Sequence, residues 1–279
     1  MTDLNLSGGR PAAYVLGHSS HELDRLKTQA HLIDPITRQF FQHAGIVPGL
    51  RVLDVGSGAG DVAFLAADLM GDTGEVIGTD KSPAAIAAAR ARAADRSLGT
   101  VSFREGDPAS MTFERPFDAV IGRYVLMFQS DPAKMLRKCA AHLRPGGLIV
   151  FHELDWDGVR SLPAAPIHDR CCRWIVETLR LSRAEMRMGV KLYSTFVAAG
   201  LPAPWMRLEA VIGGGANNAE LLQLTANLVG TLLPEMERLG VATAAEVGLD
   251  TLAQRMQAEA EASGSVIIGR SEIGAWTRI

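Results

Sequence analysis

The chain of 279 residues carries 28 Lys and Arg against 31 Asp and Glu, a net charge of −3, and 47% of its residues are hydrophobic. A weakly acidic chain lacks the basic surface expected of a nucleic-acid-binding protein. No apolar run approaches the roughly 20 residues needed to span a membrane. The 3 cysteines do not make a disulfide framework, and no Cys and His spacing typical of a metal site occurs. We therefore expect a cytoplasmic globular enzyme with reduced thiols, no metal and no membrane insertion.

Helical spacing of apolar residues begins near the N-terminus, from His21 to His43. Pro35 interrupts this pattern, which predicts two short helices or one kinked helix.

Strands and helices then alternate along the chain. Strands are predicted at residues 52–55, 75–79, 101–105, 117–122 and 148–151, followed by later strands at 205–212 and 265–276. The early apolar runs are continuous, as in strands that are covered on both faces. This order predicts an α/β fold with a doubly wound, mostly parallel, seven-stranded sheet and helices on both faces. Residues 45–157 would form the core, and 158–279 the remainder of the same domain, with helical insertions at 158–185 and 217–262.

A glycine-rich turn connects the first predicted strand to a helix, in the sequence Asp54-Val55-Gly56-Ser57-Gly58-Ala59-Gly60. Gly56 and Gly58 permit backbone angles or a close approach that a Cβ atom would prevent. The helix that follows offers unpaired N–H groups to a ligand, at the sheet edge where such folds bind nucleotides. A nicotinamide fingerprint would need G-x-G-x-x-G. Here the third glycine comes one place early and Asp61 would repel a pyrophosphate, so a nicotinamide-dependent oxidoreductase remains only an alternative.

Four short motifs in order extend this pattern: the Asp54–Gly60 turn, Asp80, Gly106-Asp107 and Arg144-Pro145-Gly146-Gly147. Together they resemble the motif series of class I, Rossmann-like S-adenosylmethionine-dependent methyltransferases. The small-molecule group that includes the ubiquinone and menaquinone methyltransferases is most similar. The resemblance covers about residues 45–157. It implies S-adenosylmethionine as cofactor, S-adenosylhomocysteine as product, and in-line methyl transfer to a small, partly apolar acceptor.

The same resemblance implies which residues bind the cofactor. They are Asp54, Gly56, Ser57, Gly58, Gly60, Asp80, Lys81, Gly106, Asp107, Pro108, Ala109 and Arg123. Asp80 would accept hydrogen bonds from the ribose hydroxyls, and Asp107 from the adenine amino group. Pro108 departs from the family pattern because it has no N–H to donate to the adenine. Residues 1–44 would form a helical lid, in which Tyr14 and Gln29 close over the cofactor.

Candidate catalytic residues follow the fourth and fifth strands: Tyr124, His152 and Glu153. A histidine suits the role of a base near neutral pH. Neighbours on a strand point to opposite faces, so His152 or Glu153 would face the acceptor, but not both. Each also has a structural interpretation, the histidine as a buried hydrogen-bonding group and the glutamate as an acceptor for loop N–H groups.

Three questions stay open at this level. An acceptor that is already nucleophilic needs only proximity, so a base is not obligatory. The atom that is methylated cannot be read from the sequence. Residues 217–262 could form an acceptor pocket or a dimer interface, so the protein could be a monomer or a homodimer. A non-catalytic cofactor-binding or partner-binding protein of the same fold is a second alternative to the methyltransferase.

Overall fold

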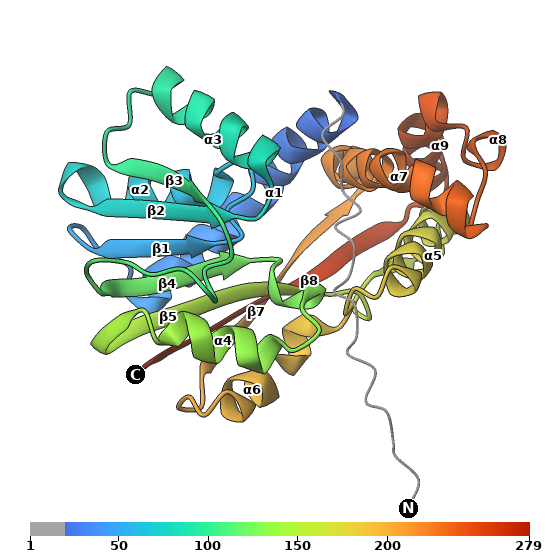
Figure 1. Ribbon diagram of the computed structural model, residues 1–279. Coiled ribbons are helices and arrows are strands. Elements are labelled where there is room, and N and C mark those ends of the chain that lie inside the picture. The colour runs from blue at the N-terminus through green and yellow to red at the C-terminus, as the bar shows by residue number, and fades with distance from the viewer. Residues whose placement is uncertain (1–19) are drawn as a thin grey trace, which may run out of the picture.

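The computed structural model describes residues 20–279, with side chains from residue 28 onward. Eight strands form one sheet in the order β3-β2-β1-β4-β5-β8-β6, with β7 paired to β8, and helices cover both of its faces (Figure 1). The strands are β1 (Arg51–Val55), β2 (Glu75–Asp80), β3 (Val101–Glu105), β4 (Phe117–Arg123), β5 (Leu143–Asp155), β6 (Arg160–Leu162), β7 (Trp205–Gly214) and β8 (Val266–Arg278). The helices are α1 (Ser20–Ala44), α2 (Asp61–Met70), α3 (Pro83–Asp95), α4 (Pro132–Ala140), α5 (Pro166–Leu181), α6 (Met188–Ala198), α7 (Ala219–Leu239), α8 (Ala244–Val247) and α9 (Leu249–Ser263).

In the parallel part of the sheet, β1, β2, β4 and the later part of β5 are buried on both faces, as their continuous apolar runs predict, whereas the edge strand β3 alternates between buried and exposed residues. In β1, Val52 packs into the cluster under α1, α2 and α3, whereas Leu53 and Val55 pack into the cluster under α4, α5 and α6. This alternation follows from the two-residue period of a strand. The predicted doubly wound core is confirmed.

Two of the helices begin with a polar cap followed by proline, a common signal for a helix start. The side chain of Ser82 accepts from Ala85 N at the start of α3, and that of Asp131 accepts from Lys134 N at the start of α4. Of the two alternatives predicted around Pro35, the structure has the single helix, because α1 runs as one element through this residue. Its buried residues Phe40 and Phe41 hold the helix against the sheet.

The antiparallel part of the sheet contains one more strand than predicted. β8 runs antiparallel between β5 and β7, and the three-residue β6 pairs with its beginning. β6 escaped the sequence analysis because so short a strand has no readable alternation. β5 also begins earlier than predicted, since the turn Arg144–Gly147 lies within it as an irregularity opposite β4.

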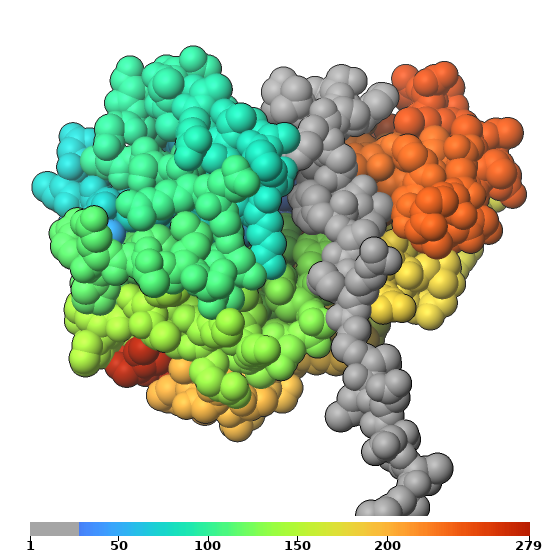
Figure 2. Space-filling view, in the orientation of Figure 1, coloured from blue at the N-terminus to red at the C-terminus, as the bar shows by residue number. Residues whose placement is uncertain are grey.

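The helices of the two predicted insertions gather beyond the carboxyl ends of the strands. α7 packs against α1, α5 and α9, and Figure 2 shows these yellow and orange segments at the opposite side of the molecule from the cyan and green α/β segments. Within residues 20–279, no helix combines the length and apolarity needed to cross a membrane.

Candidate cofactor and acceptor site

The turn between β1 and α2 depends on three glycines with left-handed backbone angles. Gly56, Gly58 and Gly60 have φ values of 67°, 52° and 94°. A Cβ at Gly56 would come within 2.7 Å of Val125, whereas one at Gly58 would meet nothing within 4 Å. The backbone over Gly58 therefore faces open space, as a loop that contacts a ligand requires.

Asp80 at the end of β2 braces this loop. Its Oδ2 accepts from Gly58 N at 3.0 Å and its Oδ1 from Ser82 N at 2.8 Å. Ser57 N donates to Thr79 O at 2.9 Å, and Gly60 N donates to Ser57 O at 2.8 Å. The loop is thus held in one conformation by the end of the neighbouring strand.

Beneath the loop lies an acid without a hydrogen-bond partner of ordinary geometry. Both carboxyl oxygens of Asp54 are buried, and neither has a hydrogen bond of ordinary geometry among the described residues, although the backbone N–H of Ala63 lies close enough to favour the ionised form. Burial raises the pKa of Asp54 well above its usual value, and Asp80 and Asp61 add to the effect against the opposing charge of Arg123. An unpaired buried carboxylate is costly, and a ligand that brings a cation or N–H donors would remove that cost.

The remaining predicted cofactor residues, which follow β2 and β3, have partners within the protein. Lys81 Nζ lies 2.9 Å from Asp107 Oδ2, and Ala109 N donates to Asp107 Oδ1 at 2.9 Å. The Asp107 side chain is partly exposed, and against the opposing effect of burial the hydrogen bonds from Lys81 and Ala109 lower the pKa of its carboxyl. Gly106 N donates to Asp80 O, and Pro108 O contacts His142 Nε2. The Ala109 N–H, a candidate for the adenine contact, is therefore used within the loop.

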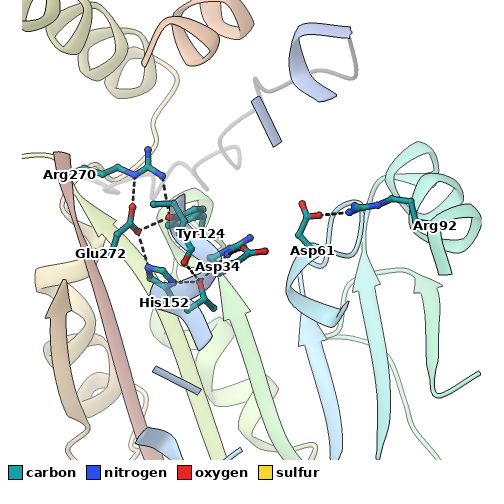
Figure 3. Close-up of polar contacts among 10 residues, drawn as sticks. Asp34, Asp61, Arg92, Tyr124, His152, Arg270 and Glu272 are labelled. Atoms are coloured by element: carbon teal, nitrogen blue, oxygen red, sulfur yellow. Dashed lines mark hydrogen bonds and ion pairs between the residues drawn. The ribbon is translucent and has the colours of Figure 1, made fainter. Parts of the chain in front are cut away.

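Asp61, at the first position of α2, is paired rather than free. Arg92 of α3 donates to Asp61 Oδ1 and to Ala59 O, each at 2.6 Å (Figure 3). The pair fastens the end of the glycine loop to the next helix.

A second group of polar residues lies at the ends of β4, β5 and β8, with contributions from α1. Arg123 is buried and donates to Asp34 Oδ1 at 2.7 Å and to Thr37 Oγ1 at 2.9 Å. Tyr124 has a positive φ of 56°, and its hydroxyl donates to Glu272 Oε2 at 2.6 Å. Burial and the Glu272 charge raise the pKa of the Tyr124 hydroxyl, so it is protonated at neutral pH.

His152 is fully buried, and both of its ring nitrogens have partners. Nδ1 lies 3.1 Å from Thr37 Oγ1 and Nε2 lies 2.8 Å from Glu272 Oε2. An ionised carboxylate only accepts, so Nε2 carries the proton. The single hydroxyl proton of Thr37 has two acceptors at 3.1 Å, the Ile33 carbonyl oxygen and the Nδ1 of a neutral ring. Burial lowers the pKa of His152, against the opposing effect of Glu272, in agreement with a neutral ring.

Glu153 points to the other face of β5, as the strand alternation predicts. Its Oε1 accepts from Val125 N at 2.8 Å and from Leu126 N at 2.7 Å, and its Oε2 lies 3.4 Å from Met127 N. Burial raises the pKa of Glu153 to about 8, although these N–H groups favour its ionised form. Of the two neighbours, His152 is the one on the side of Tyr124 and Glu272.

Two charged residues of β8, Arg270 and Glu272, belong to this group although the sequence analysis did not single them out. Arg270 Nε lies 2.9 Å from Glu272 Oε1, and Arg270 Nη2 donates to the Tyr124 hydroxyl at 3.2 Å (Figure 3). Burial alone would raise the pKa of Glu272, but the Arg270 charge and the His152 hydrogen bond hold this pKa at about 2. Their spacing of two residues places them on one face of the strand. Two opposite charges on one face of a mainly apolar strand are the sequence signal that could have identified them.

Arg270 and Glu272 line a small, mainly apolar pocket with a cavity volume of about 30 Å³, or about 430 Å³ when the space open to solvent is counted. Its walls come from α1, α5, α7, β7 and the segment after β5, and include Ile33, Trp156, Val211, Leu221, Leu224 and Leu228. His168 and Cys172 of α5 also line it, with Cys172 Sγ 3.4 Å from His168 Nε2. The predicted insertions thus contribute walls to one pocket beside the β4–β5 edge.

The predicted lid residues are only partly described. Tyr14 lies outside the described residues, and Gln29 is a buried residue of α1. Asp34 and Thr37 of the same helix, which the sequence analysis did not identify, reach the strand ends.

Comparison with known proteins identifies this arrangement. A family model described as a methyltransferase domain matches residues 46–198. The chain therefore belongs to the methyltransferase domain family, which confirms the resemblance inferred from the four motifs.

Individual relatives agree with the family. Aklanonic acid methyltransferase DauC of Streptomyces sp. (strain C5) is 37% identical over 48% of this chain, and the match covers 60% of that relative. The 2-phytyl-1,4-naphtoquinone methyltransferase of Synechococcus elongatus is 29% identical over 67% of this chain and 80% of its own. The solved Haemonchus contortus phosphoethanolamine N-methyltransferase 2, in complex with phosphomonomethylethanolamine and S-adenosylhomocysteine, has a TM-score of 0.55 at 16% identity, covering 88% of this chain and 52% of its own. Because this identity is only 16%, the match to the solved structure shows similarity of fold alone.

Proposed function

We propose that this protein transfers a methyl group from S-adenosylmethionine to a small, partly apolar acceptor. The observation that carries the proposal is the Asp54–Gly60 turn in a methyltransferase-domain chain. An open, braced glycine loop lies there over the buried carboxyl of Asp54, which has no hydrogen bond of ordinary geometry among the described residues. A cofactor with an ammonium group would supply what this carboxylate lacks.

The proposed cofactor contacts follow from the positions of the side chains. Asp54 would face the amino group of the methionine portion, the backbone at Gly58 would lie against the cofactor, and Asp80 would accept from the ribose. Asp80 already accepts two backbone N–H groups, and a carboxylate has lone pairs for further donors. When bound, S-adenosylmethionine supplies an electrophilic methyl group.

The chain's own contribution to the reaction would be alignment and exclusion of water. The apolar pocket beside β4, β5 and β8 would hold the acceptor, and proximity is worth several orders of magnitude in rate. Tyr124, at the end of β4, remains the candidate for contact with the reactants through its ring, since its hydroxyl is held by Glu272 and Arg270. His152 and Glu153 would act as positioning residues, because both are fully buried and have their hydrogen-bonding atoms occupied.

The wider setting is part of the same proposal. Residues 1–44 would act as a lid, 45–157 as the cofactor-binding core and 158–279 as the pocket-forming remainder of one domain. The three cysteines are free and buried, which fits a reducing, cytoplasmic location. We expect a monomer or homodimer that binds no nucleic acid.

Calorimetric titration of the protein with S-adenosylmethionine, S-adenosylhomocysteine and NADH tests the proposal. Saturable binding of both sulfur ligands without NADH is the expected result. Binding of NADH alone would replace the proposal by a nicotinamide-dependent oxidoreductase. Binding of the sulfur ligands without methyl transfer to any of a broad acceptor panel would favour a non-catalytic cofactor-binding protein.

A further inference from the structure

The pocket beside the proposed cofactor site has one cation among its described lining residues, Arg270. Its side chain is 10% exposed, and its guanidinium lies 5.4 Å from the Tyr124 ring centre and 5.9 Å from that of Trp156. Contacts to Glu272 and to the Tyr124 hydroxyl use Nε and Nη2. In Figure 3 the third nitrogen of the guanidinium points away from both partners.

Trp156 lines the same pocket and carries a second hydrogen-bond donor. The indole Nε1 of Trp156 is buried and has no hydrogen-bond partner among the described residues. An indole nitrogen can only donate, and a buried donor without an acceptor is costly. A ligand with oxygen acceptors could therefore accept hydrogen bonds from both Trp156 and Arg270, which lie at the same end of the pocket.

Three neighbouring groups are already committed elsewhere. The Tyr124 hydroxyl donates to Glu272 Oε2 and accepts from Arg270, and His152 Nε2 contacts that same carboxylate oxygen. This arrangement keeps Glu272 ionised and fixes the guanidinium in orientation. Arg270 is thus held in place by its own strand, with a donor left for a ligand.

We propose that Arg270 and Trp156 form the acceptor-binding end of the pocket, and that the acceptor is an apolar organic acid bound through its ionised carboxylate. This inference rests on the proposed function, because it names the substrate class of that site. Methyl transfer would form a bond between the carboxylate oxygen and the methyl carbon while the bond from that carbon to sulfur breaks. The electron pair stays on sulfur, so the products are a neutral methyl ester and S-adenosylhomocysteine. No proton has to be removed from an acceptor that is already ionised.

The test uses the full chain saturated with S-adenosylhomocysteine and a matched set of probes: 2-naphthoate, the neutral 2-naphthamide and the cationic 2-naphthylmethylamine. Calorimetry should show that the acid binds at least about 10-fold more tightly than the amide, as expected for a charge-assisted hydrogen bond. The amine should bind least. Equal binding of acid and amide, preference for the amine, or no binding of the acid would overturn the inference.

Substitutions assign the effect to the two residues. Trp156→Phe keeps an aromatic ring and removes the N–H, and should weaken naphthoate binding about 5- to 10-fold while leaving the amide nearly unchanged. Arg270→Met should abolish the preference for the acid, and Arg270→Lys should restore part of it. Arg207→Met, on the exposed part of β7 where Arg207 pairs with Glu209, is the matched control and should change nothing.

The readouts separate the two levels of proposal. Unaltered S-adenosylhomocysteine affinity shows that each variant is folded, so an unchanged naphthoate affinity in folded Trp156→Phe and Arg270→Met would contradict the inference alone. Failure of the parent protein to bind S-adenosylhomocysteine would instead contradict the proposed function.

Discussion

Thr37 of α1 and His152 of β5 meet through a 3.1 Å contact between the threonine hydroxyl and Nδ1 of the ring. The contact joins the first described helix to the strand that ends at the proposed acceptor site. Together with the Glu272 contact on Nε2, it occupies both nitrogens of a fully buried ring. A histidine held in this way is better suited to fixing its neighbours than to exchanging protons with a substrate.

Replacement of His152 distinguishes these roles. His152→Ala should lower the free energy of unfolding by about 3 kcal/mol, because it leaves a cavity beside Phe40 and removes a partner from buried Glu272. His152→Gln should be milder, and its turnover should follow the same pH profile as that of the parent protein. Loss of one ionisation from that profile, with unfolding unaffected, would instead identify His152 as a base.

Asp54 should make cofactor binding dependent on pH. Its raised pKa means that the free protein holds a proton there at acidic pH, while a bound ammonium group favours the ionised form. S-adenosylhomocysteine affinity should therefore rise with pH until the Asp54 pKa is passed, by at most about tenfold per pH unit. Calorimetry across pH 5–8 measures this, and Asp54→Asn should give weak, nearly pH-independent binding. A parent profile that is flat would remove Asp54 from the binding site.

Gly58 and Gly200 offer a matched pair. Both have left-handed backbone angles, and a Cβ at either would meet nothing within 4 Å. Each change to Ala should cost about 1 kcal/mol of stability from backbone strain. Only Gly58→Ala should weaken S-adenosylhomocysteine binding, by about tenfold or more, because its methyl group would occupy the space over the loop. Equal affinities in the two variants would show that this face of the loop is not a binding surface.

Replacing Asp80 should affect both the loop and the ligand. Asp80→Asn keeps one acceptor oxygen but puts an amide where a carboxylate braces Gly58 and Ser82. S-adenosylhomocysteine affinity should fall by about 100-fold, as expected for losing a charge-assisted contact. Asp95→Asn, on the exposed end of α3, serves as the control. An unchanged affinity in Asp80→Asn would contradict the ribose assignment.

Glu153 should give a pH-dependent contribution to stability. Its pKa rises from an ordinary value of 4.5 to about 8 on folding, so folding favours the protonated form. The stability that Glu153 contributes is therefore present below pH 4.5 and is lost as pH rises towards 8, at no more than roughly 1.4 kcal/mol per pH unit. Chemical denaturation should show the unfolding free energy of the parent falling relative to Glu153→Gln over this range. A difference that stays constant from pH 5 to 8 would show that the glutamate is ionised throughout.

The cofactor half of the site was largely predictable from sequence because its signals are local. The three glycines, the acid one residue before the end of β1 and the acid that ends β2 are close in the chain, and the turn geometry of the glycines follows from their residue type. The parallel core was predictable for the same reason, since each strand and helix carries its own periodicity.

The acceptor half depends on contacts between distant segments, which no local pattern encodes. Asp34 pairs with Arg123 across 89 positions, and His152 meets Glu272 across 120. Whether His152 faces a substrate or a partner is decided by where α1 and β8 pack. The sequence analysis therefore left both interpretations of His152 open, and it did not single out Arg270 or Glu272.

The position of β8 in the sheet also has a consequence for biosynthesis. This strand is inserted between β5 and β7, both of which precede it in the chain, and it carries Arg270 and Glu272. On a translating ribosome, β1 to β5 and the glycine loop can form while the acceptor side still lacks its central strand. Tyr124 and His152 gain their shared carboxylate only once residues 266–278 have emerged, so the nascent chain can acquire a cofactor-binding loop before it has a finished acceptor pocket.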